Sequence, residues 1–427
     1  MYTIEELYHL YLQHPSVQTD TRKLQKGDIF FALKGPNFNG NVYAATAIEL
    51  GAAFVVVDEE TGISNEKIVK VEDALKALQA LAKHHRQQLN IPVLAITGSN
   101  GKTTTKELIN SVLSTQYITY TTQGNLNNHI GVPLTLLSIK KDAQMAVVEM
   151  GANHLKEIES YCQYTLPTHG LITNCGKAHL EGFGGVEGVR KGKGELYDFL
   201  RQDKHTAFVN WDYGYLQTMS RGIENIIKYG STEGEVIGSL IANEPFLKVG
   251  VQGKTGVLEI ETQLVGDYNL PNVLSAVAVG RHFNITEANI KKAIEDYTPS
   301  NSRSQLLIKD SNTIILDAYN ANPTSMKAAI ENFAQLQAEK KIVLIGAMAE
   351  LGDESIHEHE EIIKLLGKYN WEQVVLVGGT FGQIQHPFLY FSSSLEAKEW
   401  LDKQQFTNSH LLIKGSRSMQ MEKLINI

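Results

Sequence analysis

The sequence predicts an α/β protein with mostly parallel sheets, and three observations support this prediction. Apolar runs of strand length alternate with helical patterns over residues 91–212, and the same alternation returns over 313–416. A glycine-rich loop typical of phosphate binding follows the first strand of the first series, at 98–103. The length of 427 residues is enough for about three domains, so each series can form a domain of its own.

The predicted elements divide the chain into three parts, at 1–90, 91–300 and 301–427. In the first part, strand patterns at 27–33 and 52–58 precede a polar helix at 74–90. In the second, the strands are 91–98, 143–151, 168–176 and 205–212, the helices are 103–115, 154–162 and 186–200, and a β-rich stretch at 225–266 and helices at 270–283 and 286–297 follow. The polar segment 297–305 is expected to be a hinge, before strands at 313–320, 341–348, 373–379 and 410–416 that are separated by helices.

Composition excludes several classes of protein. The net charge of −8 and its even dispersal argue against a nucleic-acid partner. Cys162 and Cys175 are too few for a disulfide framework or a cysteine-built zinc site, so they are expected to be core thiols in a reducing compartment. The first residues lack a basic flank and an apolar segment, and no run approaches the roughly 18 apolar residues of a membrane span. A cytoplasmic protein without a membrane span is expected.

The strongest single pattern is TGSNGKTT, which lies between an apolar strand and an amphipathic helix. Backbone N–H groups of such a loop cradle phosphates, its lysine reaches the β and γ oxygens, and the first hydroxyl holds Mg²⁺. We therefore expect ATP or GTP to bind here, although Ile96 stands where a full Walker A motif has glycine. The nucleotide-binding residues expected in the loop are Gly98, Ser99, Asn100, Gly101, Lys102, Thr103 and Thr104.

Two residues at neighbouring strand ends are candidates for metal binding. Glu149 ends a strand at the carboxyl edge, where ligands gather in open α/β folds. A carboxylate there suits a metal near the phosphates, and a salt bridge is its alternative role. His179 follows the next strand at a similar level and is a candidate for a second metal, with a structural histidine as the alternative.

The stretch GVEGVRKGKGELYDFL, at 185–200, places a lysine on the apolar side of a predicted helix. At about 100° per residue, one arc contains Val186, Val189, Leu196, Tyr197 and Leu200. Lys193 lies in the middle of this arc, whereas Lys191 and Glu195 point the other way. A buried ammonium is costly unless it is paired or chemically changed. The glycines at 188, 192 and 194 each disfavour the helix by about 1 kcal/mol relative to alanine, and we interpret them as room for substrate beside the helix.

In this order, the motifs resemble those of the Mur ligase family, the ATP-dependent enzymes that build the peptide of bacterial peptidoglycan precursors. The family's loop stands here as TGSNGKTT (97–104), its acidic strand end as VVEMGA, its histidine segment as AHLEGFGG and its KGE segment as Lys193 to Glu195. GDYNLPNVLSAVAVG (266–280) is similar to the adenine-side motif, with Tyr268 replacing the usual histidine. The resemblance covers essentially the whole chain.

Four further stretches resemble one branch of this family, which adds D-alanyl-D-alanine to UDP-N-acetylmuramoyl-tripeptide. They are TDTRKLQKGDIFFALKG (19–35), TQGNLNNHIGVPLTLL (122–137), LDAYNANPTSMKAAI (316–330) and GAMAELGDES (346–355). The chain departs from the branch pattern at Thr21, at NGNVY (39–43) and at Leu316. The first two departures lie in the part expected to bind the UDP-sugar.

The resemblance implies a three-domain architecture and a reaction. A UDP-sugar-binding domain (1–90), a central P-loop ATP-binding domain (91–300) and a C-terminal Rossmann-like domain (301–427) that binds the dipeptide and completes the ATP site are implied. The terminal carboxylate of the tripeptide attacks the γ-phosphate of ATP, and the dipeptide amine then displaces phosphate from the acyl phosphate. Because two anions meet in the first step, a loop lysine and two Mg²⁺ ions are needed between them. The protein would be an ADP-forming ligase of cell wall synthesis, and we expect a monomer.

The resemblance also implies the catalytic residues, which are Lys102, Glu149, His179 and Lys193. Thr103 and Glu149 would hold the nucleotide-side magnesium, and His179 with a modified Lys193 the substrate-side ion. In this family the KGE lysine typically carries a carbamate, formed from the neutral amine and CO₂. Burial favours that amine because it lowers the pKa of a lysine.

The remaining ligands are implied by the same motifs. For ATP they are Asn269 on the adenine side, Asp317 at the ribose hydroxyls and Arg303 at the γ-phosphate once the C-terminal domain closes. For the other substrates they are Asp20, Thr21 and Arg22 at the UDP part, Asn127 and Asn128 at the muramoyl-peptide, and Tyr319, Asn320 and Asn322 at the dipeptide, with Lys414 and Arg417 near the same face. Surface or turn roles remain the alternative for Asn127, Asn128, Lys414 and Arg417.

Three competing interpretations remain. A family member that adds a diamino acid or lysine at the previous step shares the ATP site but is not expected to carry YNANPTSM. A P-loop kinase has no need of an inward lysine beside a histidine. A non-catalytic nucleotide-binding scaffold is disfavoured by the intact set of Lys102, Glu149, His179 and Lys193.

Overall fold

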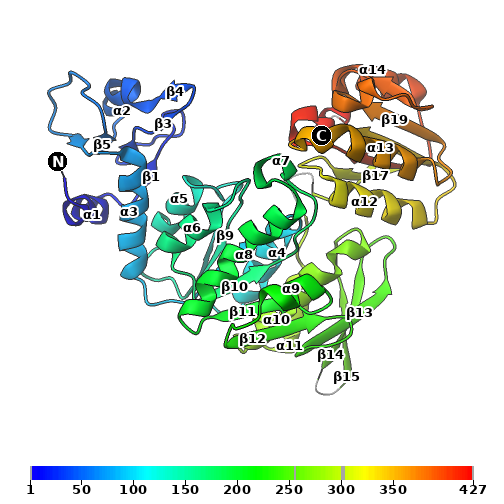
Figure 1. The fold of residues 1–427 in the computed structure, drawn as a ribbon, viewed down its shortest axis with the longest axis horizontal. Coiled ribbons are helices and arrows are strands. Elements are labelled where there is room, and N and C mark those ends of the chain that lie inside the picture. Colours follow the sequence, from blue (N-terminus) through cyan, green and yellow to red (C-terminus); the bar gives the residue numbers. More distant parts are fainter. Residues whose placement is uncertain (1, 254–255, 300–302, 426–427) are drawn as a thin grey trace.

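Three sheets follow one another along the chain, as a computed structural model shows (Figure 1). The structure describes residues 2–253, 256–299 and 303–425. Most strand pairs are parallel, so the predicted α/β class is confirmed. Part of the predicted hinge, at 300–302, lies outside the described residues.

The N-terminal sheet has four parallel strands in the order β1-β2-β5-β6, and β3 and β4 form a separate hairpin. The elements are α1 (Ile4–Gln13), β1 (Val17–Gln18), β2 (Ile29–Phe31), β3 (Lys34–Gly35), β4 (Phe38–Asn39), α2 (Ala44–Glu49), β5 (Phe54–Val57), β6 (Ile68–Lys70) and α3 (Ala74–Gln87). Helix α3 leads along the chain into the central unit and also contacts it. Nε2 of its His85 lies 2.7 Å from the carbonyl oxygen of Ile139.

The central sheet has nine strands in the order β15-β14-β13-β12-β11-β10-β7-β9-β8, and β14 runs antiparallel to both of its neighbours. Its strands are β7 (Val93–Thr97), β8 (Thr119–Thr121), β9 (Met145–Glu149), β10 (His169–Ile172), β11 (Thr206–Asn210), β12 (Asn225–Gly230), β13 (Val236–Ala242), β14 (Lys248–Gly253) and β15 (Gly256–Glu261). Its helices are α4 (Lys102–Leu113), α5 (Gly131–Leu137), α6 (Glu157–Thr165), α7 (Leu180–Phe183), α8 (Val186–Gln202), α9 (Gly214–Met219), α10 (Leu270–His282) and α11 (Glu287–Glu295).

Both faces of the central sheet are buried at β7, whose five residues are all buried. Successive side chains of a strand point to opposite faces, and helices cover both faces here. In β7, Leu94 and Ile96 pack with α4, α10 and α11. Val93 and Ala95 pack on the other face with α3, α5, α6 and α8. Strand β7 runs parallel to both β9 and β10, so the carboxyl ends of the three strands meet at one edge, which carries the phosphate loop and Glu149.

Helix α8 buries Lys193 and leaves Lys191 exposed, as its periodicity predicted. The prediction for Glu195 was wrong, since this residue is only 8% exposed. Its carboxylate oxygens accept the backbone N–H groups of Lys156 and Glu159, at 2.7 and 2.9 Å. Glu195 therefore holds the start of α6, where a negative charge is favourable to the helix dipole.

The glycines of α8 allow a close approach of α7, so our interpretation of them as room for substrate was wrong for two of the three. A Cβ atom at Gly188 would lie 1.8 Å from the carbonyl oxygen of Phe183, and one at Gly192 would lie 2.4 Å from its ring. The same ring lies 4.9 Å from Nζ of Lys193. The glycines thus let Phe183 pack against the helix beside the buried lysine.

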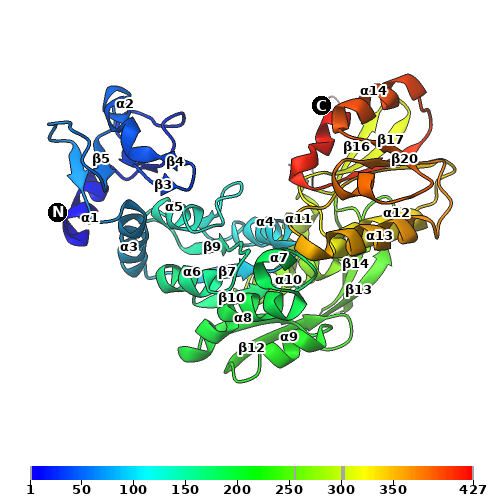
Figure 2. The same cartoon turned by 45° about the horizontal axis from the view of Figure 1, so that its top comes forward.

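The C-terminal sheet has six strands in the order β16-β17-β21-β18-β19-β20, and β16 at its edge runs antiparallel to β17. Its elements are β16 (Gln305–Lys309), β17 (Asn312–Asp317), α12 (Pro323–Gln335), β18 (Lys341–Gly346), α13 (Ser355–Leu366), β19 (Gln373–Val377), β20 (Leu389–Phe391), α14 (Ser394–Gln404) and β21 (His410–Lys414). Helices α12 and α13 lie on its side nearest the central unit (Figure 2).

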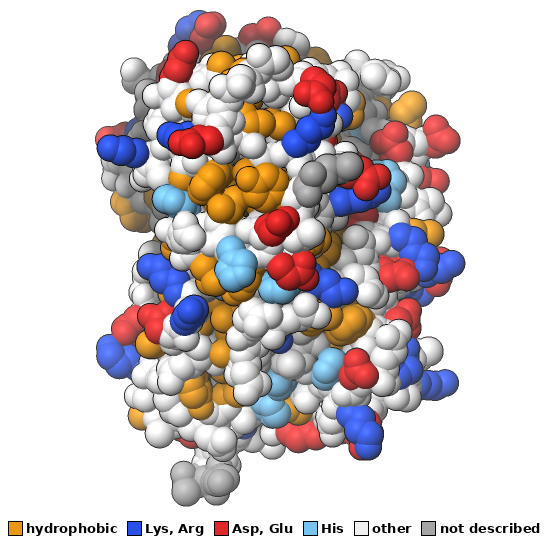
Figure 3. All heavy atoms as spheres, turned by 90° about the vertical axis from the view of Figure 1, so that its left-hand side faces the viewer, with side chains coloured by type: hydrophobic (Ala, Val, Ile, Leu, Met, Phe, Trp, Pro, Cys, Tyr) orange, Lys and Arg blue, Asp and Glu red, His pale blue; other side chains and the backbone are white. Residues whose placement is uncertain are grey.

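Surface and core features agree with the composition. On the face at the left of Figure 1, acidic and basic side chains are interspersed (Figure 3). Cys162 and Cys175 are buried and free, which confirms them as core thiols, and burial raises the pKa of Cys175 to about 12. Within the described ranges, no helix combines the length and the apolar character that crossing a membrane requires.

Two histidines meet at the edge of the central sheet opposite the phosphate loop. His169 begins β10 and His282 ends α10, with 3.1 Å between their Nε2 atoms. Burial lowers the pKa of His169 to about 3, and the neighbouring His282 adds to this shift. Burial also lowers the pKa of His282. The folded protein therefore favours the neutral form of both rings.

Acid should destabilise the protein through His169. Below about pH 6.5, the unfolded chain binds a proton at this histidine that the folded chain rejects, so stability falls by up to about 1.4 kcal/mol per pH unit. His169→Gln should flatten the pH dependence between about pH 6 and 4, because glutamine does not titrate but can still bond to His282. Denaturant midpoints at several pH values measure the effect. His9→Gln, at an exposed position, is the control, and an unchanged slope in His169→Gln would contradict the prediction.

Candidate active site

The phosphate loop joins the end of β7 to the start of α4 through two glycines with positive φ. Gly98 has φ 143° and Gly101 has φ 79°, values that side chains with a Cβ rarely adopt. A Cβ atom on Gly98 would also lie 2.0 Å from Oγ1 of Thr173. The glycines thus allow the sharp turn of the backbone from β7 into α4.

Residues at the end of β10 hold the loop from behind. Oγ1 of Thr173 donates to the carbonyl of Asn100 at 2.6 Å, and the Asn100 N–H donates to Oδ1 of Asn174 at 3.1 Å. The Ser99 N–H donates to the Asn174 carbonyl at 2.9 Å. Sequence reasoning missed Thr173 and Asn174, although both belong to a strand-end segment at the predicted ligand edge.

Lys102 begins α4 and lies folded over its own loop. Its Nζ donates to the carbonyls of Gly98 and Ser99, at 2.7 and 3.4 Å. Burial lowers the pKa of Lys102, the charge of Glu149 opposes this shift, and the charge of Arg303 adds to it. The two cations thus lie near each other at the loop, which is where a triphosphate would need them.

Glu149 lies at the end of β9 with an exposure of 1%. Its Oε2 accepts the hydroxyl of Thr103 at 2.9 Å, and its Oε1 accepts Nδ2 of Asn127 at 2.7 Å. Both partners are neutral donors, so the alternative of a salt bridge does not describe this carboxylate. Thr103 and Glu149 therefore lie together as predicted, and Asn127 contacts the same carboxylate.

The other pair of expected metal ligands, His179 and Lys193, meets different partners. Nδ1 of His179 contacts the carboxylate of Glu350 in the C-terminal unit. This contact lowers the pKa of Glu350. Lys193 is 1% exposed, and its Nζ donates to the Ala152 carbonyl at 2.9 Å. Burial lowers the pKa of Lys193 to about 7, and the charge of Lys102 adds to the shift.

The expected metal ligands do not form a preassembled acidic cage. In the part of the chain that the structure describes, no group of three or more His, Cys, Asp and Glu side chains could hold a metal ion. Mg²⁺ is commonly held by one or two carboxylates together with substrate phosphates and water. The single carboxylate of Glu149 beside the hydroxyl of Thr103 fits that donor set.

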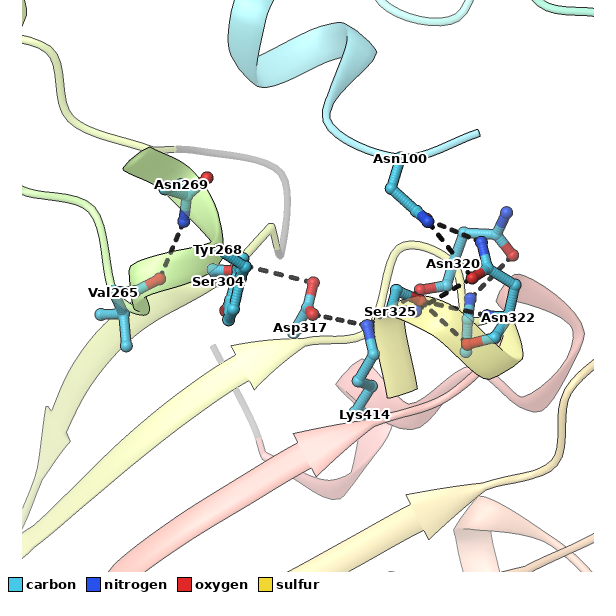
Figure 4. A network of polar contacts seen from close by, with 11 residues as sticks. Asn100, Val265, Tyr268, Asn269, Ser304, Asp317, Asn320, Asn322, Ser325 and Lys414 are labelled. Atoms are coloured by element: carbon cyan, nitrogen blue, oxygen red, sulfur yellow. Dashed lines mark hydrogen bonds and ion pairs between the residues drawn. The ribbon is translucent and has the colours of Figure 1, made fainter. Parts of the chain in front are cut away.

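A polar network connects the expected adenine side to the ribose side (Figure 4). The hydroxyls of Tyr268 and Ser304 lie 2.9 Å apart, and the Ser304 N–H donates to Oδ1 of Asp317 at 3.3 Å. Nδ2 of Asn269 donates to the Val265 carbonyl at 2.8 Å. Asn269 thus stabilises the turn before α10. The Ser304 N–H holds the carboxylate of Asp317 in place at the end of β17.

Lys414 holds Asp317 from the neighbouring strand. It is buried, pairs with Oδ2 of Asp317 and donates to the Asn320 carbonyl at 3.3 Å. Arg303 lies over the ring of Tyr319, with 3.6 Å from its guanidinium carbon to the ring centroid. The ribose-side carboxylate and the YNANP segment (319–323) are therefore held by one lysine.

The residues expected at the UDP and peptide parts are mostly engaged locally. On either side of Thr21, Arg22 and Asp20 form a bidentate ion pair: Nε of Arg22 donates to Oδ1 of Asp20 at 2.9 Å and its Nη2 donates to Oδ2 at 2.7 Å. This pair lowers the pKa of Asp20 to about 2. Oδ1 of Asn128 accepts two backbone N–H groups at the start of α5, so this side chain stabilises a turn, which was its alternative role. Arg417 is exposed and pairs with Glu422.

Contacts between the central and C-terminal units contain residues that sequence reasoning missed. Lys177 pairs with Glu358 at 2.5 Å, and its N–H donates to Oγ1 of Thr324 at 2.9 Å. Glu350 reaches His179 from the same side. Glu350 and Thr324 belong to the stretches GAMAELGDES and LDAYNANPTSMKAAI, so their motifs were visible but their partners were not.

Comparison with known proteins adds an independent finding. The descriptions "Mur ligase family, catalytic domain", "Mur ligase middle domain" and "Mur ligase, glutamate ligase domain" match residues 15–86, 96–280 and 302–416. The UDP-N-acetylmuramoyl-tripeptide--D-alanyl-D-alanine ligase of Bacillus subtilis (strain 168) is 33% identical over 96% of this chain and 92% of its own. These matches follow one another along the chain in the order of its three sheets.

Two solved structures are similar over nearly the full length. A crystal structure of MurF from Acinetobacter baumannii has a TM-score of 0.87 and 32% identity, and the match covers 96% of this chain and 92% of that one. MurF ligase from Thermotoga maritima, in complex with ADP, has a TM-score of 0.87 at 24% identity over 97% and 96% of the two chains, which shows a shared fold. The three-domain architecture expected from the sequence is confirmed.

Proposed function

The chain belongs to the Mur ligase family, and we propose that it joins D-alanyl-D-alanine to the terminal carboxylate of UDP-N-acetylmuramoyl-tripeptide at the expense of ATP. One observation carries this proposal most strongly. The phosphate loop of the central domain directly contacts the YNANP segment of the C-terminal domain, through Asn100 and Asn322. An ATP site and the segment assigned to the dipeptide therefore face each other, as coupling ATP cleavage to amide formation requires.

The first step brings a carboxylate against the γ-phosphate. Lys102 would exchange its loop carbonyls for phosphate oxygens, and Arg303 would move from the Tyr319 ring toward the same oxygens. At the phosphate oxygens, both cations would reduce the repulsion between the two anions. The product of this step would be an acyl phosphate and ADP.

In the second step the dipeptide amine attacks the acyl phosphate. We propose that the dipeptide lies along Tyr319 and Asn320. The side chain of Asn320 is exposed, and its Oδ1 accepts the Ala321 N–H at 2.9 Å. The acyl phosphate must be kept from water, which would hydrolyse it, so the two domains have to meet around it. The docking contacts of Lys177 and Asn322 support such a closed arrangement, with 297–305 as the proposed hinge and 1–90, 91–300 and 301–427 as the proposed domains.

Two Mg²⁺ ions and a carbamate on Lys193 are part of this proposal. When bound, the ions would offset the charge of the triphosphate and of the attacking carboxylate. Thr103 and Glu149 supply hard oxygen donors for one ion, and His179 and the modified Lys193 would serve the other. The pKa of about 7 leaves much of the Lys193 amine neutral near that pH, and the neutral form is the one that combines with CO₂. The resulting carbamate has one negative charge and two oxygens.

We place the reaction in the cytoplasm, within peptidoglycan synthesis. The two buried, free cysteines suit a reducing compartment.

The proposed UDP contacts are Asp20, Thr21 and Arg22, whose side chains lie on the exposed surface of the N-terminal domain or close to it.

Phosphate release from ATP tests the function. The protein should release phosphate and form an amide only when UDP-N-acetylmuramoyl-tripeptide and D-alanyl-D-alanine are both present. A parallel reaction with UDP-N-acetylmuramoyl-dipeptide and lysine or diaminopimelate tests the competing ligase activity. Phosphate release that ignores either substrate, or the absence of an amide product, would overturn the proposal.

A further inference from the structure

The phosphate loop and helix α12 meet in a reciprocal amide pair. Nδ2 of Asn322 donates to Oδ1 of Asn100 at 2.7 Å, and Nδ2 of Asn100 donates to Oδ1 of Asn322 at 3.4 Å. Figure 4 shows the two side chains pointing toward each other from the central and C-terminal domains. The pair links a residue of the phosphate cradle to the first turn of the helix that follows the YNANP segment.

On the Asn100 side of the pair, hydrogen bonds hold the backbone in place. Its carbonyl accepts Oγ1 of Thr173 at 2.6 Å and Nδ2 of Asn174 at 3.1 Å, while its N–H donates to Oδ1 of Asn174 at 3.1 Å. The backbone of Asn100 is therefore held on both sides. Its side chain extends from a rigid base toward the C-terminal domain.

The Asn322 end is equally constrained, because this residue is the N-cap of α12 and is only 6% exposed. Its Oδ1 accepts the Ser325 N–H at 3.0 Å, and its own N–H donates to Oγ of Ser325 at 3.1 Å. The cap uses the oxygen, which directs the amide nitrogen at Asn100. The side chain was expected to bind the dipeptide, yet both of its polar atoms have protein partners.

A second contact seats the same helix turn on the central domain. Oγ1 of Thr324 accepts the Lys177 N–H at 2.9 Å. A Cβ atom on Gly176 would lie 2.8 Å from that hydroxyl oxygen, so the two backbones approach closely. The start of α12 is thus held at two neighbouring points, one of them in the phosphate loop.

We propose that Asn322 is a positioning residue for amide formation and that it acts through Asn100. This inference rests on the proposed ligase function. The amine of the dipeptide must approach the acyl phosphate to about 3–3.5 Å, and a misplacement of about 1 Å can cost about 10²-fold in rate. The amide pair sets the position of the YNANP segment relative to the phosphate loop, and so aligns the two reacting groups.

Three variants separate the roles of Asn322. Asn322→Ser keeps an equally good N-cap but is too short to reach Asn100. Asn322→Asp also keeps the cap, and its carboxylate can accept Nδ2 of Asn100. Asn332→Ser is the matched control, because Nδ2 of Asn243 donates to Oδ1 of Asn332 at 3.1 Å. That pair joins the same two domains at the other end of the same helix.

The two half-reactions are measured separately. ATP and the tripeptide without the dipeptide give one burst of ADP per enzyme, which reports acyl phosphate formation, and adding D-alanyl-D-alanine gives amide turnover. Asn322→Ser should lower amide turnover, as kcat/KM for the dipeptide, by about 10-fold to 100-fold while leaving the burst unchanged. Asn322→Asp should recover most of the loss, and Asn332→Ser should match the wild type.

Substitution on the other side of the pair completes the test. Asn100→Ser removes the same contact without touching the helix cap. In the double variant with Asn322→Ser, amide turnover should be no lower than in the less active of the two single variants, because the two residues act as one unit. Asn100→Ser by itself should give the same kind of loss of amide turnover, so this single variant decides the question if Asn322→Ser does not fold.

Several results would overturn the inference. These are wild-type amide turnover in Asn322→Ser, an equal loss in Asn332→Ser, no recovery in Asn322→Asp, or additive losses in the double variant. A wild-type protein that forms no amide would overturn the ligase proposal and this inference with it. An active wild type with an unaffected Asn322→Ser variant would overturn this inference alone.

Discussion

Replacing Lys102 with methionine should lower the rate of ADP formation by about 10³-fold, because the loop would lose the charge that stabilises the transferring phosphoryl group. Methionine has a similar length, so the glycine-rich backbone can keep its shape. In the wild type, Nζ of Lys102 is held by the carbonyls of Gly98 and Ser99. It is therefore already at the loop before the nucleotide arrives.

A rapid-mix measurement of the ADP burst, with ATP and UDP-N-acetylmuramoyl-tripeptide, checks this prediction. Lys102→Arg should retain part of the rate, since it keeps the charge but has a wider head group. Thermal unfolding of each variant confirms that the domain is intact. A methionine variant with a wild-type burst would remove Lys102 from the proposed chemistry.

Replacing Lys193 with alanine should lower amide formation by at least about 100-fold, the loss expected when a metal site is disturbed. Acetate or propionate should restore part of the activity, because a free carboxylate can occupy the space that the carbamate leaves. The position is enclosed, with Nζ near the Ala152 carbonyl and the ring of Phe183. A small anion would therefore be held close to its required place.

Lys191→Ala is the matched control, since it removes an exposed lysine from the same helix. It should leave activity unchanged. Incubation with ¹³CO₂ should give the wild type a carbamate signal in ¹³C NMR that the Lys193→Ala variant lacks. Full activity of Lys193→Ala without added carboxylate would refute the role proposed for the carbamate.

Residues that are neighbours in the chain were enough to predict the local features of this protein. The strand at 91–98, the helix that buries Lys193 and the phosphate loop each follow from residues that are neighbours in the chain, where periodicity and glycine spacing are informative. The order of these features also determined the family, because the motifs occur in sequence order. Strands β8 and β20 have three residues each, too few to show a period, and neither was expected.

The packing of distant segments sets which side chains meet. Asn127 binds Glu149, Glu350 reaches His179, and Asn322 pairs with Asn100, although each pair is far apart in the chain. Glu195 and Gly188 were misread for the same reason, since their roles depend on α6 and on Phe183 of α7. Periodicity describes which side of its own helix a residue occupies, whereas the partner on that side is set by how distant elements pack.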